Sequence, residues 1–597
     1  MDKREMKQCQ NCKKDFTIES EDFDFYKKIG VPPPTWCPEC RKQRRLLFRN
    51  ERILKKNKCF QCGREIISLY DMESPFNVYC QECWWGDLWD GTQFGKEYDF
   101  SRPFFTQFHE LFQEVPRIAL NGHRSNKDSE YVNYIIEAKD SYLCFGGGYI
   151  ENVLFSTLGV RTKDSAEIYF SFDCTFCYEI SDCFNCYRLI FGRGCVDCRD
   201  SYFLDDCKNC NDCILCSGLR NKSYCYKNRQ LSKSEFVAIK EEFGNLTQNK
   251  ISSYKKEFVS IALQTPKRFL DISHSQSCVG DHITNSKNCV FSFNIIEGEN
   301  CKYSSDIMFK AKDIYDGTSC GIGNEQIYEA MTSSININQG KFSSVVRNNC
   351  FDIQYVMDLH SSSHLFGCIG LKNKQYCILN KQYTKEEYEE LVPKIIKHMN
   401  DMPYIDQKGR VYTYGEFFPL ELSPFAYNET IAQEYFPLTK EQALTQGFGW
   451  KDSDTKNYSI TKKPEDLPDS IKEVNDSILN EVIGCVHGGT CVHQCTTAFR
   501  IIPQELEFYR RMNLPLPVLC PNCRHYERLA QRNPLKLWKR QCMCNESRIE
   551  DQKQKAHQNT VVHQHGEGRC PNIFETSYAP ERKETVYCES CYQNEIV

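Results

Sequence analysis

A segment rich in paired cysteines occurs twice in this chain, once near each end. Residues Cys12–Cys59 align with Cys495–Cys542 without a gap, at a constant offset of 483 residues. The match resumes at Cys62–Cys83 against Cys570–Cys591, at an offset of 508 residues. Cysteine pairs that keep their register through a duplication indicate a small module held together by those cysteines, through either metal or disulfides.

The expected compartment favours metal. The first residues, 1–14, are charged and lack the apolar core of a secretory signal. The sequence also has no run of 18 apolar residues, the length that indicates a membrane span. We therefore expect a cytoplasmic protein, whose 37 cysteines stay reduced. With 597 residues the chain can form several domains, and its net charge of −5 is too small to indicate a partner.

The spacing of the terminal cysteines predicts about four closed, structural zinc sites, because two Cys-x2-Cys pairs supply four thiolates for a tetrahedral ion. Reduced buried cysteines are the alternative. The predicted ligands of the first two sites are Cys9, Cys12, Cys37 and Cys40, then Cys59, Cys62, Cys80 and Cys83. Those of the other two are Cys491, Cys495, Cys520 and Cys523, then Cys542, Cys570, Cys588 and Cys591. Cys485, His487 and His493 compete for one position in the third site, and Cys544, His563 or His565 could substitute in the fourth.

The N-terminal module resembles the "probable zinc-ribbon" family of small bacterial domains, which is treble-clef-like. The matching residues are Cys9, Cys12, Phe16, Phe25, Tyr26, Pro33, Cys37, Pro38, Cys40 and Arg41. The C-terminal copy matches at Cys495, Phe499, Phe508, Tyr509, Pro515, Cys520, Pro521, Cys523 and Arg524, and departs by having three residues between Cys491 and Cys495. The whole chain also resembles a cysteine-rich family of candidate-phylum bacteria, through residues 494–513 and 574–593.

A second duplication occupies the middle of the chain. Cys216–Cys225 matches Cys368–Cys377 at an offset of 152 residues. Short strand-like runs, broken by Asp, Asn, Ser and Gly, predict a coiled sheet or solenoid in each copy. The repeated Asp-Cys-x-Asn-Cys pattern of the first copy resembles the β-helix of the tubulin-cofactor-C and cyclase-associated proteins. Helices are predicted at 231–245 and 384–399, where each would close one end of a coil.

The sequence thus predicts a mostly β, multidomain protein, with paired zinc ribbons at both termini flanking two tandem β-helix-like blocks. The expected domains are a double ribbon at 1–95, an aromatic connector at 96–130, blocks at 131–258 and 259–400, an extended tether at 401–484, and a second double ribbon at 485–597. The aromatic residues of 84–112 are expected to pack the ribbons against the first block. A stacking surface for a ligand or nucleic acid is the alternative.

The central cysteines Cys207, Cys210, Cys213 and Cys216 have a spacing close to that of bacterial ferredoxins. At an offset of 152 the second block has Leu359, Ser362, Leu365 and Cys368. Leucine at two of the four positions favours a ladder of core cysteines, because buried free cysteine behaves as a small hydrophobic residue. An additional zinc or iron–sulfur site and redox-active dithiols are the alternatives.

No catalytic motif was found, and Asp358, His360 and His364 are interpreted as corner residues rather than as metal ligands or acid–base groups. The residues between Cys40 and Cys59 are strongly basic and are the candidates for contacts with phosphate: Arg41, Arg44, Arg45, Arg49, Arg52, Lys55 and Lys56. The sequence therefore favours a non-enzymatic, zinc-binding scaffold for a macromolecular partner, with RNA or DNA as one candidate. A protein–protein interaction scaffold is the first alternative, and an iron–sulfur or β-helix enzyme is the second. Neither a membrane nor a small-molecule substrate is indicated.

Overall fold

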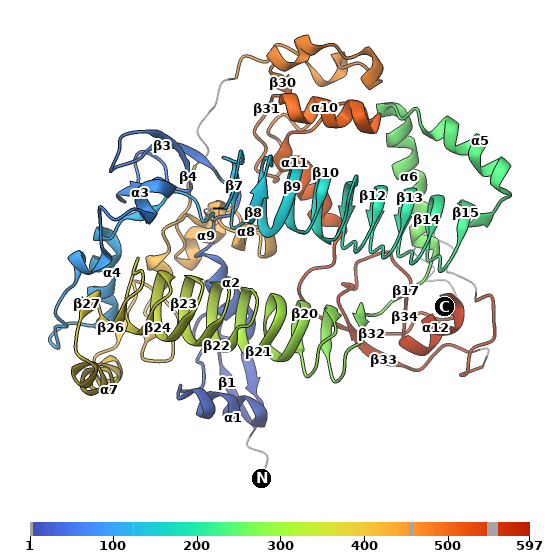
Figure 1. Cartoon of the computed structure of the whole chain (residues 1–597). Helices are drawn as coiled ribbons and strands as arrows, with labels where there is room; N and C mark the ends of the chain where they lie inside the picture. Colours follow the sequence, from blue (N-terminus) through green and yellow to red (C-terminus); the bar gives the residue numbers. More distant parts are fainter. Residues whose placement is uncertain (1–3, 123–124, 453–457, 546–558, 567, 597) are drawn as a thin grey trace. The chain divides into compact units, whose positions relative to one another are not determined.

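The computed structural model describes residues 4–122, 125–452, 458–545, 559–566 and 568–596 (Figure 1). The chain divides into two compact units that alternate along the sequence. Unit 1 comprises Met1–Leu120, Leu270–Ser453 and Leu535–Leu537, and unit 2 comprises Asn121–Phe269, Asp454–Pro534 and Trp538–Val597. Each unit therefore combines one terminal module with the central block that is not its neighbour in sequence.

Unit 2 contains a sheet of ten strands, called the first sheet. Successive strands are neighbours and run parallel, except that β16 is antiparallel to β15 and that β7 and β8 both pair with β9. Paired residues are 12 apart, as in Tyr187↔Arg199 and Arg199↔Asn211. The strands are β7 (Val132–Asn133), β8 (Ile136–Lys139), β9 (Cys144–Val160), β10 (Lys163–Phe172), β11 (Tyr178–Ser181), β12 (Tyr187–Arg193), β13 (Arg199–Asp205), β14 (Asn211–Ser217), β15 (Ser223–Tyr226) and β16 (Arg229–Gln230).

Unit 1 contains the second sheet, which also has ten strands in sequential order. Its neighbours are parallel except for the last pair, and the step between paired residues lengthens to 13 in the middle, as in Ile327↔Gly340. The strands are β18 (Ile272–Ser273), β19 (Val279–Thr284), β20 (Val290–Lys302), β21 (Ser305–Cys320), β22 (Glu325–Ser333), β23 (Ile337–Arg347), β24 (Cys350–His360), β25 (Ser363–Phe366), β26 (Gln375–Ile378) and β27 (Lys381–Gln382). The prediction of a mostly β chain with two blocks of short strands is confirmed.

The Asp and Asn residues that punctuate both blocks occupy left-handed backbone positions. At intervals of 12 residues, Asp173, Asn185, Asp197 and Asn209 have φ values of 55°, 54°, 55° and 52°. Asn and Asp tolerate this region better than other residues with a side chain, because their short polar groups bond locally. The Asn209 amide also donates to the Asn221 side chain one step along, at 2.8 Å. The corner residues thus explain the periodic sequence.

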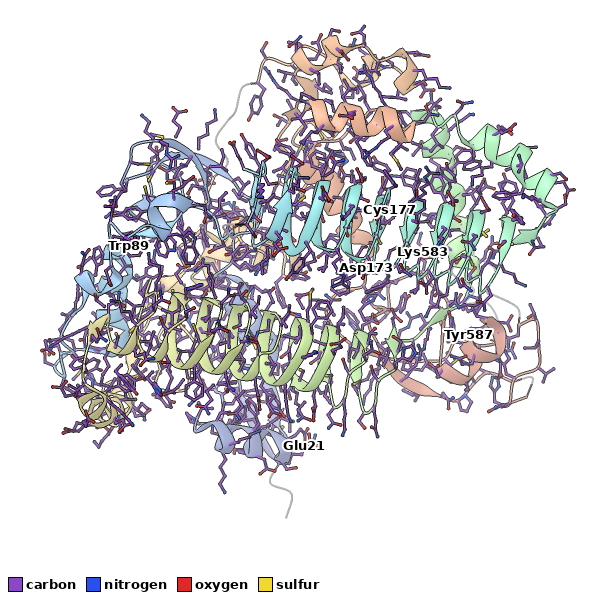
Figure 2. All side chains as sticks on the ribbon, in the orientation of Figure 1. Glu21, Trp89, Asp173, Cys177, Lys583 and Tyr587 are labelled. Carbon is purple, nitrogen blue, oxygen red and sulfur yellow. The ribbon has the colours of Figure 1, made fainter. Side chains whose placement is uncertain are left out.

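The central cysteines of the first sheet lie in its core, and Cys177, which is labelled in Figure 2, is one of them. Cys207, Cys210, Cys213 and Cys216 have no solvent-exposed surface. Their thiols donate to backbone carbonyls, for example from Cys210 Sγ to Lys208 O at 3.4 Å, and burial raises the pKa of Cys207 well above its ordinary value. Complete burial and hydrogen bonds to backbone carbonyls support the interpretation of these cysteines as a core ladder.

Cys213→Leu should give a folded protein. Cys213 pairs with Cys225 in the sheet register, and the duplicate has Leu365 paired with Cys377 at the same two positions. The larger side chain should cost about 1–3 kcal/mol as local overpacking. The midpoint of thermal denaturation, measured with the metal content, checks this. Cys210→Leu is the comparison, because the duplicate has serine at that position and gives no precedent for leucine. Loss of a bound cofactor from Cys213→Leu would contradict the core interpretation.

A capped helix follows each sheet, as predicted. Helices α5 (Lys233–Phe243) and α7 (Lys385–Asp401) begin after Ser232 and Thr384, each of which forms a capping box with a glutamate three residues later. Phe236 packs on Tyr224 of β15, and Tyr388 on Tyr376 of β26, with ring centroids 5.8 Å apart in both cases. A further helix, α6 (Gln248–Gln264), was not predicted.

Two predictions about the segments between modules and sheets are wrong. The aromatic residues of 84–112 pack on the second block rather than the first: Phe104 of α4 (Phe104–Glu114) lies 5.4 Å from Phe366 between ring centroids. The segment 401–484 is not an extended tether in its first half, because Phe417, Phe418 and Tyr427 are fully buried in the core of unit 1. Its elements are β28 (Tyr404–Ile405), β29 (Val411–Tyr412), η2 (Leu420–Leu422), η3 (Tyr427–Glu429), α8 (Ala432–Tyr435), α9 (Lys440–Gln446), η4 (Pro464–Asp466), η5 (Ile471–Glu473) and η6 (Asp476–Asn480).

None of the helices in the described ranges combines the length and the apolar character needed to cross a lipid bilayer.

Candidate metal centres

Each terminal module consists of two ribbons, and each ribbon begins with an antiparallel pair of short strands. Two helices follow the pair in the first ribbon of each module, and a short strand and one helix follow it in the second. The N-terminal elements are β1 (Glu5–Gln8), β2 (Asp15–Ile18), α1 (Ser20–Ile29), α2 (Pro38–Leu46), β3 (Lys55–Lys58), β4 (Glu65–Ser68), β5 (Val78–Tyr79), α3 (Gln81–Trp85), η1 (Gly91–Phe94) and β6 (Arg117–Ile118). The C-terminal elements are β30 (Ile483–Gly484), β31 (Ala498–Phe499), α10 (Pro503–Met512), α11 (Pro521–Gln531), β32 (Trp538–Gln541), β33 (Ile573–Thr576), β34 (Val586–Tyr587) and α12 (Glu589–Ile596), while β17 (Lys267–Arg268) pairs with β34.

The first two predicted cysteine sets each converge on one point. In the set Cys9, Cys12, Cys37 and Cys40, and again in Cys59, Cys62, Cys80 and Cys83, all sulfur atoms lie within 4.8 Å of one another. The Sγ atoms of Cys12 and Cys37 are 3.8 Å apart, and those of Cys62 and Cys80 are 3.9 Å apart. A tetrahedral zinc ion with Zn–S bonds of about 2.3 Å gives S···S distances of about 3.8 Å. Both groups therefore have the dimensions of a four-thiolate metal site.

One hydrogen bond recurs in all four ribbons and identifies equivalent positions. The backbone N–H of the third cysteine donates to the sulfur of the first, at 3.2 or 3.3 Å: Cys37 to Cys9, Cys80 to Cys59, Cys520 to Cys485, and Cys588 to Cys542. The accepting cysteine also follows the first hairpin strand directly in each ribbon. By both criteria, Cys485 occupies in the third ribbon the position that Cys9 has in the first.

The third site therefore differs from the prediction. The four thiols that converge there belong to Cys485, Cys495, Cys520 and Cys523, and Cys491 lies in a neighbouring group with His487 and His493. The Sγ atoms of Cys485 and Cys523 are 3.8 Å apart, and those of Cys520 and Cys495 are 3.9 Å apart. The sequence comparison failed at this point because nine residues separate Cys485 from Cys495, whereas two separate Cys9 from Cys12.

The fourth set has the predicted composition. The sulfur atoms of Cys542, Cys570, Cys588 and Cys591 lie within 4.8 Å of one another, and those of Cys570 and Cys588 are 3.8 Å apart. Cys544, His563 and His565 do not replace any of these four. They lie together beside the site, with Cys544 Sγ 3.0 Å from His563 Nδ1. Part of the insertion that separates Cys542 from Cys570, residues 546–558, lies outside the described residues.

The arginines of α2 form buried ion pairs with the second sheet. Arg41 Nε lies 3.0 Å from Asp316 Oδ2, and Arg45 Nη1 lies 3.0 Å from the other oxygen of the same carboxylate. Arg44 pairs with Glu329 at 2.8 Å and with Glu416 at 2.9 Å. All three guanidinium groups are at most 1% exposed. Each is fixed by carboxylates from elements far away in sequence.

The prediction that this basic stretch offers its arginines to phosphate is therefore wrong for Arg41, Arg44, Arg45 and Arg49. Arg49 is also buried and pairs with Glu51 at 2.6 Å. A guanidinium that is sealed inside the protein by carboxylates cannot reach a nucleic-acid backbone. Of the remaining candidates, Lys55 pairs with Glu429, Arg52 is half-buried, and Lys56 is exposed on β3.

The C-terminal module repeats this arrangement on the first sheet. Arg524, Arg528 and Arg532 align with Arg41, Arg45 and Arg49 at the offset of 483. Arg524 and Arg528 both pair with the buried Glu167 of β10, and Arg532 Nη2 lies 2.7 Å from Asp182 Oδ1. Because Arg49 Nη1 also donates to Thr332 Oγ1 of β22, the same three positions of the duplicated module attach it to a sheet in both units.

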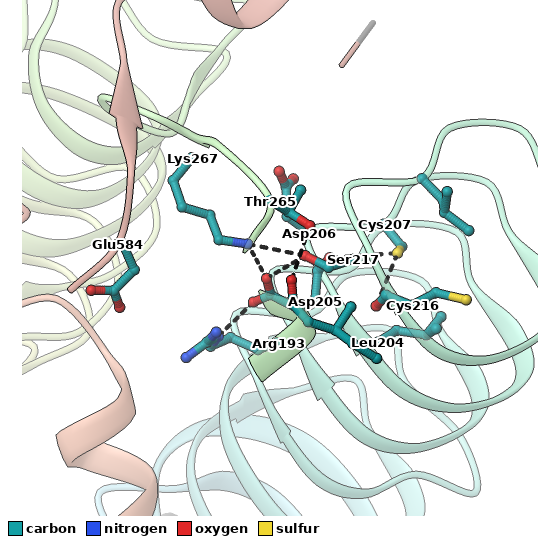
Figure 3. Close-up of polar contacts among 12 residues, drawn as sticks. Arg193, Leu204, Asp205, Asp206, Cys207, Cys216, Ser217, Thr265, Lys267 and Glu584 are labelled. Carbon is teal, nitrogen blue, oxygen red and sulfur yellow. Dashed lines mark hydrogen bonds and ion pairs between the residues drawn. The ribbon is translucent and has the colours of Figure 1, made fainter. Parts of the chain in front are cut away.

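A second buried contact in unit 2 involves Lys267 of β17 (Figure 3). Its ammonium group pairs with Asp205 of β13 and lies 3.1 Å from Ser217 Oγ. Arg193 Nε also lies 2.7 Å from Asp205. Burial by itself would raise the pKa of Asp205, but the two cations hold it well below its ordinary value. Because β17 pairs with β34, this contact also connects the C-terminal module with the first sheet.

The residues considered for acid–base chemistry have structural partners. Asp358 lies 3.2 Å from Arg347, and the His360 ring packs on Trp85, with centroids 5.0 Å apart. His364 Nδ1 lies 2.9 Å from Asp352, and its ring stacks on Tyr376. His364 and Asp358 thus interact with different partners and do not form one site.

Comparisons with known proteins add no relative to these observations: no protein-family model matches the chain, and neither a curated protein nor a solved structure matches it significantly.

Proposed function

We propose that this protein is a non-enzymatic scaffold in which zinc ions rigidify two terminal modules. We also propose that the exposed apolar residues of its ribbons bind a protein partner. One observation carries the proposal: the helix that begins at the third metal-binding cysteine of each module places its arginines in buried ion pairs with a central sheet. The four-thiolate groups are closed sets, and closed sets are typical of structural zinc rather than of catalytic zinc, which keeps an open position. Metal binding would thereby fix the helix that attaches module to sheet.

The two central sheets would be closed solenoids. This follows the resemblance to the tubulin-cofactor-C type of β-helix and is supported by the sequential parallel pairing with steps of 12 or 13 residues. A solenoid presents a rigid, regular surface, because each turn contacts only its neighbours. Such a support holds attached modules at fixed positions, which is the property a scaffold requires.

The exposed apolar residues of the ribbons favour a protein partner over nucleic acid. Phe60 and Val486 each follow the first ligand cysteine of a ribbon, and their exposed fractions are 66% and 59%. Met6 of β1 and Ile573 of β33 are 74% and 71% exposed. Large apolar side chains at such positions gain free energy when a partner covers them. The arginines that would have favoured phosphate are buried instead.

A photo-crosslinking amino acid at position 60 tests the partner class. In cells that produce the full chain, we expect a discrete protein adduct from position 60. The control places the same amino acid at position 259, because Val259 is 54% exposed on α6, which belongs to no ribbon. An equal pattern of adducts from both positions would contradict the proposal.

Binding of nucleic acid by the purified full-length protein distinguishes a nucleic-acid scaffold from a protein-binding one. Mixed-sequence RNA and DNA should bind weakly even at low salt, because the exposed residues of the basic stretch provide few phosphate contacts. Tight, salt-sensitive binding without a protein adduct at position 60 would favour the nucleic-acid scaffold instead. A brown protein that absorbs near 400 nm would indicate an iron–sulfur centre and would remove the zinc-scaffold assignment.

A further inference from the structure

Both C-terminal ribbons carry an insertion between their first and second ligand cysteines, and each insertion contains one cysteine and more than one histidine. In the third ribbon the insertion lies between Cys485 and Cys495 and contributes His487, Cys491 and His493. In the fourth it lies between Cys542 and Cys570 and contributes Cys544, His563 and His565, while its third histidine, His557, lies outside the described residues. The N-terminal ribbons have only two residues at this point, Gln10 and Asn11 in the first, and Phe60 and Gln61 in the second. Side chains of the same two metal-binding types have thus been added at the same position of both ribbons.

The residues added to the third ribbon converge on a cysteine that already belongs to the four-thiolate group. The ligand atoms of His487, Cys491, His493 and Cys523 lie within 4.8 Å of one another. Cys523 Sγ is 3.7 Å from Cys491 Sγ in this group and 3.8 Å from Cys485 Sγ in the four-thiolate group. Both distances equal the edge of about 3.8 Å expected for thiolates on a tetrahedral zinc ion. Cys523 is therefore a shared corner of two tetrahedral ligand sets.

The two histidines have nitrogen atoms that lack a partner. The Nδ1 atoms of His487 and His493 are buried from solvent and accept or donate no hydrogen bond within the described residues. A buried polar atom without a partner costs on the order of 1–3 kcal/mol. A metal ion between the rings, whose centroids are 5.3 Å apart, would satisfy both atoms. The His493 ring is also held by stacking on Tyr526, with a centroid distance of 5.5 Å.

The fourth ribbon also brings its inserted cysteine and two of its inserted histidines together, with Asn559 donating to Cys544 Sγ at 3.0 Å. Cys544 Sγ lies 3.0 Å from His563 Nδ1 and 3.3 Å from His565 Nε2, and its thiol also interacts with that of Cys591. Cys591 is the last cysteine of its four-thiolate group, as Cys523 is in the third ribbon. His563 is fully buried, and its other nitrogen lies 3.2 Å from a carboxylate oxygen of Glu595. A carboxylate on the far nitrogen is the usual means of orienting a metal-binding imidazole.

We propose that each C-terminal ribbon holds two zinc ions bridged by one thiolate, Cys523 in the third ribbon and Cys591 in the fourth. One ion of each pair would take four thiolates, and the other would take two thiolates and two imidazoles, a set that suits zinc. The proposal rests on the assignment of zinc to the four-thiolate groups. Bridging also lowers the local charge. Five thiolates around two Zn²⁺ ions leave one negative charge, whereas four thiolates around one ion leave two.

Zinc analysis of the full-length protein tests the number of ions. We expect roughly six zinc ions per chain, two from the N-terminal ribbons and four from the C-terminal ribbons. The double variant His487→Ala/His493→Ala should lose one ion. Val492→Ser is the matched control, because Val492 lies in the same insertion, is 86% exposed and contributes no ligand atom. A wild-type content of four ions would overturn the proposal, whatever the variants do.

Cadmium-113 NMR of the exchanged protein tests the bridge itself. Two cadmium ions that share a thiolate show scalar coupling to each other, so we expect two coupled pairs of resonances and two uncoupled resonances. One pair should become a single uncoupled resonance in His487→Ala/His493→Ala, and both pairs should persist in Val492→Ser. Four uncoupled resonances would overturn the bridged sites but leave the zinc scaffold intact. A protein that is isolated with iron, or with no bound metal, would overturn the zinc assignment instead.

Discussion

Replacing Cys40 by serine should unfold the first ribbon and detach α2 from the second sheet. Cys40 supplies one of four converging thiols, and Cys37, which precedes α2, supplies another. Structural zinc contributes about 10–16 kcal/mol to the folding of isolated zinc-finger peptides, so the loss of one thiolate removes much of the energy that shapes the ribbon. The arginines anchored to the second sheet are on this helix and follow Cys40 directly.

Two measurements on Cys40→Ser follow from this expectation. Zinc content should fall by one ion relative to the wild type, and a protease specific for arginine should cleave within residues 41–49, which are protected when α2 is docked. Cys278→Ser is the matched control, because Cys278 is a partly exposed free thiol at a corner of the second sheet. It should keep the zinc content and the protease resistance. A Cys40→Ser protein with full zinc content and intact protection would rule out Cys40 as a ligand.

Much of this arrangement could be predicted from local sequence signals. Cys-x2-Cys pairs define the first two sites, because four sulfur atoms around one ion require little beyond their own spacing. The helices expected at 231–245 and 384–399 correspond to α5 and α7, whose starts depend on Ser232 and Thr384 and on glutamates within the same turn. The periodic Asp and Asn residues indicated the strands for the same reason: each of them sets the backbone at its own position.

What could not be predicted depends on residues that are distant in sequence. In the sequence, Arg45 belongs to a basic stretch that has the composition of a solvent-exposed surface. Only the fold places Asp316 and Glu329 beside it. In the sequence these two residues do not differ from other polar residues of the central blocks. Nothing in the module indicates which of the two duplicated blocks it joins, because both blocks offer acidic residues. The sequence-based choice of Cys491 instead of Cys485 as a member of the third site was wrong for another reason. An insertion moved the first ligand out of alignment, and only its position after β30 and the N–H···S bond identify it.

Arg45→Ala should destabilise unit 1 by about 3–5 kcal/mol, the usual cost of removing one partner from a buried ion pair. Arg45 lies 3.0 Å from Asp316 and 3.3 Å from Glu329, and none of these three side chains is exposed. Without Arg45 the Glu329 carboxylate loses one of its cations. Hydrogen exchange at the amides of α2 and the midpoint of urea denaturation both report on this loss. Lys397→Ala is the control: Lys397 is 77% exposed and pairs with Asp401 on α7, so it should change stability by less than about 0.5 kcal/mol.

The pH dependence of Arg45→Ala separates the loss of an ion pair from a simple loss of packing. Burial already raises the pKa of Glu329 above its ordinary value, despite the neighbouring arginines, and removing Arg45 should raise it further. A carboxyl group whose pKa is higher in the folded state than in the unfolded state stabilises the fold as pH falls through the folded value. The stability deficit of Arg45→Ala relative to the wild type should therefore shrink between pH 8 and pH 5. The double variant Arg45→Met/Glu329→Gln should recover part of the loss at pH 8, because it leaves no unpaired charge at position 329. A deficit that is independent of pH and unaffected by Glu329→Gln would assign the role of Arg45 to packing alone.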